Sequence, residues 1–249
     1  MLHQFSRTEL VVGREGLDRL RQSTVAVIGV GGVGSYTVEA LARAGIGHII
    51  LVDKDVVDVT NINRQLPALM STVGQPKVDI MAKRIQDINP ECEVMTKRLF
   101  FLPETQDELF SHHIDYVADA IDTVSAKIHL VVSCKDRGIP IVSSMGAANK
   151  LDPTKFQVMD ISETTIDPIA RVMRRELRKH GIEHGLKVVC SSEQPMAPRP
   201  EVTEAIARVP EPGETLPRKA TNPPASISFV PPIAGLILAS IIIRDLVGV

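Results

Sequence analysis

Residues 24–34, TVAVIGVGGVG, decide how this chain of 249 residues folds. Residues 24–28 are a run of β-branched and apolar side chains, the pattern of a buried strand. A glycine turn follows, and residues 36–44 continue as a predicted helix; the turn consists of Gly29, Gly31, Gly32 and Gly34. Because glycine has no Cβ atom, phosphate oxygens can reach backbone N–H groups at a helix N-terminus, where the helix dipole favours negative charge. The stretch therefore predicts a nucleotide site.

An acidic residue completes this pattern. Residues 48–52, HIILV, predict a second strand, and Asp53 follows it directly. Strand, glycine turn, helix, strand and acid in this order place a carboxylate where it can bind a ribose hydroxyl. A tight turn between strand and helix, without a ligand, is the alternative. The glycine turn alone does not say which nucleotide binds.

The composition is that of a globular protein. The chain is 44% hydrophobic and 23% charged, and its net charge of −2 attracts neither nucleic acid nor a membrane surface as a whole. Cys92, Cys134 and Cys190 lie far apart, which argues against a disulfide framework and against a structural zinc site. The first ten residues lack the apolar core of a signal peptide, so we expect a cytoplasmic protein.

The order of predicted elements favours a Rossmann-like α/β fold, with a doubly wound, mostly parallel sheet and helices on both faces. Further strands are expected at 91–99, 116–121, 141–144, 156–160 and 187–190, and short helices within 2–22 and 103–109. We expect a single domain, 1–249, with a nucleotide-binding half, 1–150, and a substrate-facing C-terminal extension, 151–249. The proline-rich residues 191–224 predict a mobile crossing loop.

Polar residues gather just after the second strand, where open α/β sheets bind ligands. Asn61, Arg64 and Gln65 cluster there, and Lys77 opens a helix over 77–88. Two cations beside the glycine turn suit a triphosphate, whereas a hydride-transfer cofactor does not need them. For each cation taken singly, ordinary surface charge is the alternative.

A further carboxylate, Asp122, follows the predicted strand over 116–121. In this place it can hold Mg²⁺ on phosphate oxygens or cap the helix over 124–137, and both roles can coexist. The small-residue loop over 145–149 either approaches the ligand or forms a tight crossing. Whether a monovalent cation binds near this loop stays open.

Arginines repeat along one face of the helix that begins after Asp167; they are Arg171, Arg174, Arg175 and Arg178. This face binds RNA phosphates or is simply solvated, and no aromatic residues are interleaved for base stacking.

Near the C-terminus, the apolar run after Pro232 reaches only to Ile243, too short for a bilayer. We therefore expect no membrane span, and a core or subunit-interface helix instead.

Several spaced motifs resemble the ubiquitin-activating-type adenylating superfamily over residues 5–150. They are the glycine turn, Asp53, Asp55, Asn61-x-x-Arg64-Gln65, Gln75-Pro76-Lys77 and Asp119-x-x-Asp122. The resemblance implies ATP and Mg²⁺ as cofactors, and ligase-type activation of a carboxylate as an acyl-adenylate with release of pyrophosphate. Fixed cations fit this chemistry, because attack on the α-phosphate builds negative charge there.

The resemblance also implies a role for individual residues. Gly32 and Asp53 would hold the adenosine, Asn61 and Arg64 the phosphates, Lys77 the α-phosphate charge, and Asp122 the Mg²⁺. Arg7 matches the N-terminal arginine that the family lends to the triphosphate of a neighbouring subunit, which implies a homodimer.

The second half of the chain, from Lys150 through Asp167 and the arginine-rich helix, resembles the tRNA threonylcarbamoyladenosine dehydratases. These enzymes activate the carboxylate of a threonylcarbamoyl group on an adenosine beside the anticodon, and the side chain closes on itself as AMP leaves. The resemblance implies tRNA as the partner of the basic helix and leaves sulfur-relay partner proteins open. The ring closure needs no enzyme thiol, so we expect Cys190 to be structural.

Three alternatives are weighed against this hypothesis. An adenylyltransferase for the C-terminal glycine of a small sulfur-carrier protein commonly carries two C-x-x-C zinc pairs, which this sequence lacks. An NAD-dependent oxidoreductase would explain the glycine turn but not Arg64, Lys77 or Asp122. A non-catalytic nucleotide sensor would not need the complete set of cations.

Overall fold

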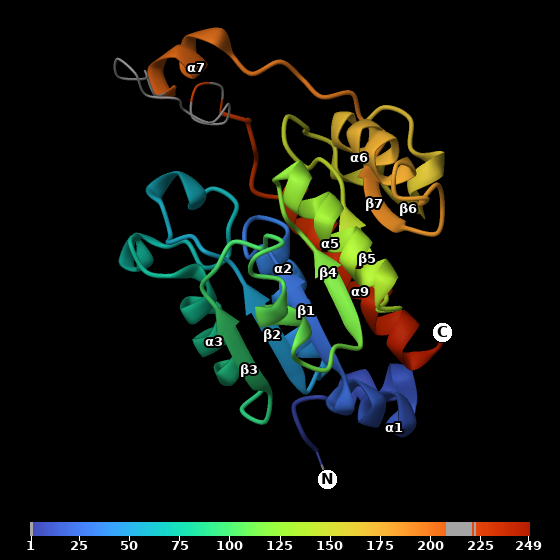
Figure 1. The fold of residues 1–249 in the computed structure, drawn as a ribbon. Coiled ribbons are helices and arrows are strands. Elements are labelled where there is room, and N and C mark those ends of the chain that lie inside the picture. Colours follow the sequence, from blue (N-terminus) through green and yellow to red (C-terminus); the bar gives the residue numbers. More distant parts are fainter. Residues whose placement is uncertain (1, 208–220, 222) are drawn as a thin grey trace.

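The computed structural model describes residues 2–207, 221 and 223–249. Within this part of the chain, seven strands form one sheet in the order β3-β2-β1-β4-β5-β7-β6 (Figure 1). Their bounds are β1 Thr24–Ile28, β2 His48–Val52, β3 Glu93–Lys97, β4 Tyr116–Asp119, β5 Ile141–Ser144, β6 Phe156–Asp160 and β7 Lys187–Ser191. Neighbouring strands are parallel except β6 and β7, which are antiparallel. The predicted doubly wound, mostly parallel sheet is confirmed.

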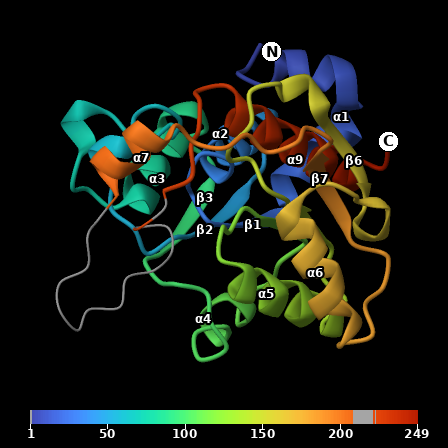
Figure 2. The ribbon, with the colours of Figure 1, turned by 90° about the horizontal axis from the view of Figure 1, so that it is seen from above.

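Helices cover both faces of this sheet, as Figure 2 shows. One face carries α1 Ser6–Gln22, α2 Gly34–Ala44, α3 Lys77–Ile88 and α9 Val230–Val247, and the other carries α4 Asp107–Phe110, α5 Val124–Asp136 and α6 Pro168–Arg178. Each layer buries its own apolar cluster against the sheet. Short 3-10 helices lie at Val59–Asn61, Met70–Thr72, Pro153–Lys155 and Ile161–Glu163.

Most helices and strands begin and end close to the residues predicted from the sequence, and the differences are local. The two short helices expected before the first strand are two halves of α1, separated by a kink at Gly13, where φ is +73°. Helix α4 begins later than expected, at Asp107, because residues 103–106 form turns. Strand β3 is also shorter than expected, since it is the exposed edge of the sheet.

Helix α9 corrects the length argument made from the sequence. It does not end at Ile243 but continues to Val247, and its 18 residues, with a mean hydropathy of 1.9, are long and apolar enough to cross a membrane. However, 56% of this helix is buried inside the protein. Asp245 in its last turn accepts a hydrogen bond of 2.7 Å from the hydroxyl of Tyr116. These contacts are those of a core helix packed across the sheet.

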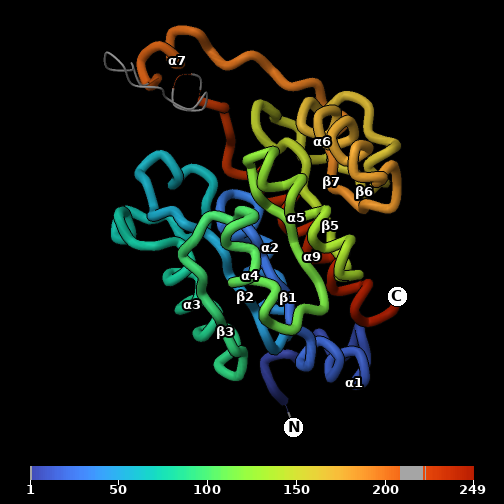
Figure 3. The backbone as a smooth tube through the Cα atoms, in the orientation of Figure 1, coloured from blue at the N-terminus to red at the C-terminus, as the bar shows by residue number. Residues whose placement is uncertain are grey.

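Between β7 and α9, residues 192–207 lead away from the sheet and residues 223–229 lead back to it, as Figure 3 shows. The first of these segments contains α7, Pro200–Ile206. Most of the remaining part of the predicted crossing loop, 208–220 and 222, lies outside the described residues, so its mobility stays a prediction. On its return, Ala225 exchanges two hydrogen bonds of 2.8 Å with Asn149, and the amide of Asn63 donates to the carbonyl of Ser226.

Candidate active site

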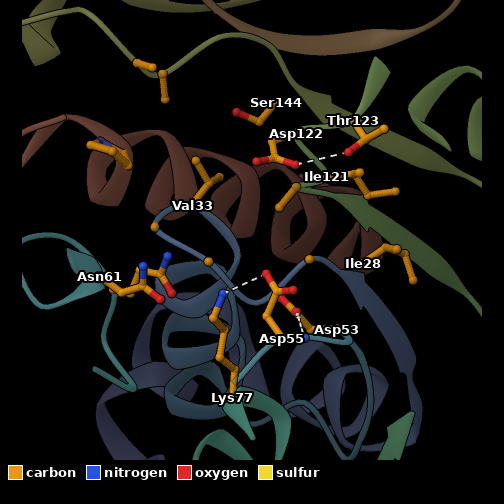
Figure 4. A pocket seen from close by; sticks show the side chains of 18 of the residues that line it. Ile28, Val33, Asp53, Asp55, Asn61, Lys77, Ile121, Asp122, Thr123 and Ser144 are labelled. Carbon is orange, nitrogen blue, oxygen red and sulfur yellow. Dashed lines mark hydrogen bonds and ion pairs between the residues drawn. The ribbon is translucent and has the colours of Figure 1, made fainter. Parts of the chain in front are cut away.

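A pocket of about 780 Å³ lies at the carboxyl ends of the central strands. Strand β1 pairs with β2 on one side and with β4 on the other, so the strand order reverses at this point. Open α/β sheets bind ligands at such a switch point. The segments that follow β1, β2, β4 and β5 all line the pocket, with Lys77 and Asp53 on one side and Asp122 and Ser144 on the other (Figure 4).

The glycine turn is packed so tightly at Gly29 and Gly34 that side chains are excluded from these two positions. A Cβ atom on Gly34 would lie 1.8 Å from the carbonyl oxygen of Gly29, and Gly29 itself has a φ of +89°. At Gly31 the nearest neighbour of a Cβ atom would be Gln65 at 3.8 Å, so a side chain there would project beside the pocket. The turn therefore presents bare backbone to the pocket, as phosphate binding requires.

Asp53 is tied to this turn by its carboxylate. One oxygen accepts a hydrogen bond of 2.7 Å from the N–H of Val30, and the other accepts one of 2.8 Å from the N–H of Asp55. Burial raises the pKa of the Asp53 carboxyl above its usual value, and the nearby Lys77 ammonium acts in the opposite direction. The carboxylate thus stands next to the glycine turn, where the sequence expected it.

Lys77 places a buried cation on the same side of the pocket. The residue is 5% exposed, and its ammonium lies 3.1 Å from a carboxylate oxygen of Asp55. The backbone fixes this pair, because the N–H of Lys77 also donates to the carbonyl of Asp55 at 3.1 Å. Asp55 was singled out as a member of the nucleotide-binding motifs, among the residues expected to bind the cofactor together with Gln65; the contact observed for Asp55 orients Lys77.

The segment after β2 supplies the amides and a second cation. Asn61 and Gln65 are buried, and Oε1 of Gln65 has no hydrogen-bond partner among the described residues. Arg64 donates to the carbonyl of Thr60 at 2.9 Å and to Oδ1 of Asn63 at 2.8 Å. A buried amide oxygen without a partner is costly unless a ligand or water satisfies it. This side of the pocket is therefore built to receive polar groups.

Asp122 faces these residues from the end of β4. Burial lowers the pKa of the Arg64 guanidinium below its usual value, and the charge of Asp122 acts in the opposite direction. The expected helix-capping role is not observed, because the N-cap of α5 is Thr123 and no side chain caps it. Among the described residues no group of three metal-ligating side chains occurs, so any cation here must take part of its coordination from a ligand.

The remaining predicted residues lie away from the pocket. Arg7 is exposed on α1 and does not line it. Arg171, Arg175 and Arg178 are exposed on α6, whereas Arg174 donates to the hydroxyl of Thr164 and is partly buried. The basic face of α6 is therefore narrower than the sequence predicted, because one of its arginines is used inside the protein.

Sequence reasoning missed part of the pocket wall, since residues 99–101, Leu-Phe-Phe, line it after β3. Residues 145–148 line it after β5, so of the two alternatives for this loop the approach to the pocket is the one observed. Ile169 and Ser226 complete the wall from α6 and from the segment before α9. The rule that ligands bind beyond the carboxyl ends of parallel strands could have found residues 99–101. No local signal marks Ser226.

Comparison with known proteins identifies the family. The model of the ThiF family matches residues 5–249. The chain belongs to the ThiF family. Within it, the chain is 56% identical to a tRNA threonylcarbamoyladenosine dehydratase of Bacillus subtilis, over 99% of this chain and 95% of that protein.

Structural comparison with ThiF-family and related proteins agrees with this assignment. The crystal structure of the E. coli tRNA N6-threonylcarbamoyladenosine dehydratase in complex with ATP matches with a TM-score of 0.86 and 33% identity, over 98% of this chain and 94% of that one. The molybdopterin-synthase adenylyltransferase of Salmonella typhimurium is 33% identical, but over only 55% of this chain and 54% of that protein. The resemblance to the dehydratases predicted from the motifs is confirmed.

Proposed function

We propose that this protein is an ATP-dependent dehydratase of the threonylcarbamoyl group on a tRNA adenosine beside the anticodon. The substrate carboxylate attacks the α-phosphate of ATP, which forms an acyl-adenylate and releases pyrophosphate. An internal nucleophile of the threonylcarbamoyl group then closes the ring, and the carboxylate oxygen leaves with AMP. The nucleoside loses one water in sum. Full-length similarity to a dehydratase, together with a pocket that gathers two cations at a glycine turn, carries this proposal.

ATP fits the pocket by chemistry and by shape. The glycine turn offers backbone N–H groups to phosphates, and Asp53 offers a carboxylate to the ribose. The apolar wall of residues 99–101 suits the adenine ring. Arg64 and Lys77 reach the same space and would stabilise the charge that builds on the α-phosphate. Asn61 and Gln65 add polar groups for the phosphates.

Mg²⁺ fits the donor set at the end of β4. This ion keeps several waters and is commonly held by one or two carboxylates plus substrate phosphates. Asp122 supplies such a carboxylate on the wall opposite Lys77 (Figure 4). Magnesium held by Asp122 would neutralise part of the triphosphate charge.

The tRNA would dock on the basic face of α6, through Arg171, Arg175 and Arg178. A protein with a net charge of −2 needs such a local positive face to approach an anticodon stem-loop. We place the protein in the cytoplasm on the similarity to the bacterial dehydratases, and we keep partner proteins of a sulfur relay as a hypothesis. No observation favours the sulfur-carrier adenylyltransferase over the dehydratase.

A homodimer would complete the site if Arg7 reaches the triphosphate of the partner subunit. We expect Arg7→Ala and Asp122→Ala to be inactive separately, and a mixture of the two to regain part of the activity, because a mixed dimer holds one intact site. Size-exclusion chromatography with light scattering measures the assembly. A mixture as inactive as its components would remove the role of Arg7 across subunits.

The test of the function is pyrophosphate release from ATP and Mg²⁺ by the purified protein. It compares tRNA carrying threonylcarbamoyladenosine, the unmodified transcript and a carrier protein that ends in glycine. We expect release only with the modified tRNA, and mass spectrometry should find the nucleoside lighter by one water. Release with the carrier protein alone would overturn the proposal.

A further inference from the structure

The pocket has a second end, which the nucleotide residues do not explain. Ser144 at the end of β5 and residues 145–148 after it line this end, and Ile169 and Ser226 line it from two other segments. These residues are small or uncharged, and they lie across the pocket from Lys77 (Figure 4 labels Ser144 on that side). Asp122 lies on the same side, but none of these lining residues is a cation. A wall without a cation is unsuited to a triphosphate but leaves room for an organic substrate.

The loop in this wall offers hydrogen-bond donors. Among the residues that the structure describes, none accepts a hydrogen bond from the backbone N–H groups of Gly146, Ala147 or Ala148. The flanking N–H groups are satisfied, because Met145 donates to the carbonyl of Val189 at 2.8 Å, and the N–H that follows Ala148 also has a partner. Successive backbone N–H groups in a concave loop bind anions such as carboxylates.

A buried ion pair holds this loop from behind. The ammonium of Lys150 lies 2.9 Å from a carboxylate oxygen of Asp167, and the two residues are 3% and 0% exposed. The same ammonium also donates to the carbonyl oxygen of Gly146. Gly146 cannot carry a side chain here, since a Cβ atom would lie 2.7 Å from the Asp167 carboxylate. The loop is thus pressed against the pair, and the carbonyl of Gly146 is turned toward the interior.

The same pair also reaches α6. The second carboxylate oxygen of Asp167 accepts hydrogen bonds of 3.0 Å from the N–H groups of Ile169 and Ala170, and so caps this helix. One carboxylate therefore joins the pocket loop to the N-terminus of the helix that bears the exposed arginines. A shift of either element would break a buried, charged contact, which is costly.

We propose that residues 144–148 form the subsite for the substrate carboxylate and its nucleoside, and that Lys150 is the positioning residue that sets the shape of this subsite. The inference deepens the proposed function and rests on it. The N–H groups of the loop orient the carboxylate without neutralising it by a cation, so its oxygen stays nucleophilic toward the α-phosphate. Lys150 acts through Gly146 and Asp167 and does not contact the substrate.

Two variants test the two parts of this proposal. Ala148→Leu fills the subsite with a larger side chain, and Lys150→Met removes the charge that holds the loop. In both we expect kcat/KM for modified tRNA to fall about 100-fold, the effect of misplacing a reacting group by about 1 Å. The affinity for a non-hydrolysable ATP analogue, measured by calorimetry, should change less than about twofold. Lys150→Arg keeps a cation and should regain a large part of the lost activity.

Controls separate this inference from a general loss of structure. Lys155→Met changes an exposed lysine of the same segment and should leave kcat/KM and the melting temperature unchanged. If Lys150→Met does not fold, the kcat/KM values of Ala148→Leu and Lys150→Arg test the proposal instead. Unchanged kcat/KM in Ala148→Leu, or a loss of ATP affinity equal to the loss of tRNA turnover, would overturn the subsite. A failure of the proposed function is distinct, since wild-type protein would then release no pyrophosphate with modified tRNA.

Discussion

The two ends of the pocket are built in different ways. At the nucleotide end, residues 29–34 and Asp53 directly follow the neighbouring strands β1 and β2, and Lys77 is fixed by its contacts with Asp55. At the other end, the loop after β5 is held by two contacts with distant segments. Lys150 pairs with Asp167, which caps α6, and Asn149 bonds to Ala225 in the segment before α9. The first end is specified by local motifs, and the second by contacts between segments far apart in the chain.

This difference bears on which end of the pocket can change without disturbing the other. A local motif keeps its geometry whatever the rest of the chain does, because its turn and caps are made within a few residues. A wall assembled from distant segments can change when any one of them is replaced. On the proposed function, we expect substrate choice to depend on the end of the pocket that residues 144–167 and Ser226 build.

The largest expected effect comes from the nucleotide end. Lys77→Met removes the buried cation beside Asp55, and we expect pyrophosphate release to fall about 100- to 1,000-fold, the usual loss when a preorganised group that stabilises developing charge is removed. Rapid-quench measurement of pyrophosphate release checks it. Lys83→Met, an exposed lysine on the same helix, is the matched control. Wild-type turnover in Lys77→Met would remove this residue from the reaction.

A second buried ion pair lets the two ends be compared directly. Lys127 donates to Asp119 at 2.7 Å, and the other oxygen of Asp119 accepts the N–H of Ile121, which lines the nucleotide end beside Asp122. We expect Lys127→Met to weaken binding of the ATP analogue with Mg²⁺ by about tenfold or more, because the segment after β4 would shift.

This change is the counterpart of Lys150→Met. Calorimetry measures the ATP affinity of both variants, and kinetics with modified tRNA measures their turnover. We expect Lys127→Met to lose ATP affinity, and Lys150→Met to lose tRNA turnover while its ATP affinity stays unchanged. Both melting temperatures should fall, since each variant leaves a buried carboxylate without its cation. Equal losses of ATP affinity in the two variants would mean that the pocket has no separate ends.

The same division explains what could be predicted from the sequence. The strands β1, β2, β5 and β6 begin and end where apolar and β-branched runs placed them, because these strands are short and bounded by turn residues. The glycine turn and Asp53 were found by their spacing alone. The role of Lys150 was not found, since nothing near it in the chain indicates that Asp167 and Gly146 will surround it.

The helix α6 was predicted correctly, but its exposed basic face was predicted to be broader than it is. A period of three and four residues places arginines on one face, yet it does not reveal that Arg174 meets the hydroxyl of Thr164. Likewise, the apolar run of α9 was judged too short because Arg244 and Asp245 interrupt it. Asp245 is accommodated by Tyr116 and by Lys187 at 2.7 Å, partners contributed by β4 and β7.

A moderate effect is expected on the tRNA side. Arg175→Glu with Arg178→Glu reverses two charges that are each 70% exposed, while Arg174 is left to its internal contact. We expect weaker binding of modified tRNA and a salt dependence whose slope is smaller by about 0.9 for each phosphate that the variant no longer neutralises, since fewer counterions are released. Filter binding across a range of salt concentrations measures the slope. Reversal of Arg14 and Lys83, an equal charge change elsewhere, should leave it unaltered.

The smallest effect is expected at Cys190, which stands close to the ion pair of the second end. The residue is 3% exposed, and burial raises the pKa of its thiol to about 11, with the charge of Asp167 acting in the same direction. A thiol that stays protonated at neutral pH is a poor nucleophile, and adenylation followed by ring closure requires none. Cys190→Ala should therefore keep the wild-type rate with modified tRNA, at a cost in stability of about 1 kcal/mol.

The pH dependence of stability tests the same point without turnover. Because the folded-state pKa is raised, the folded protein holds this proton more tightly, so stability falls as pH rises from about 9 toward about 11. Chemical denaturation across this range should give a flatter fall for Cys190→Ala than for wild type. Loss of activity in a folded Cys190→Ala would instead indicate a thioester step, and with it a reaction closer to that of the sulfur-carrier enzymes.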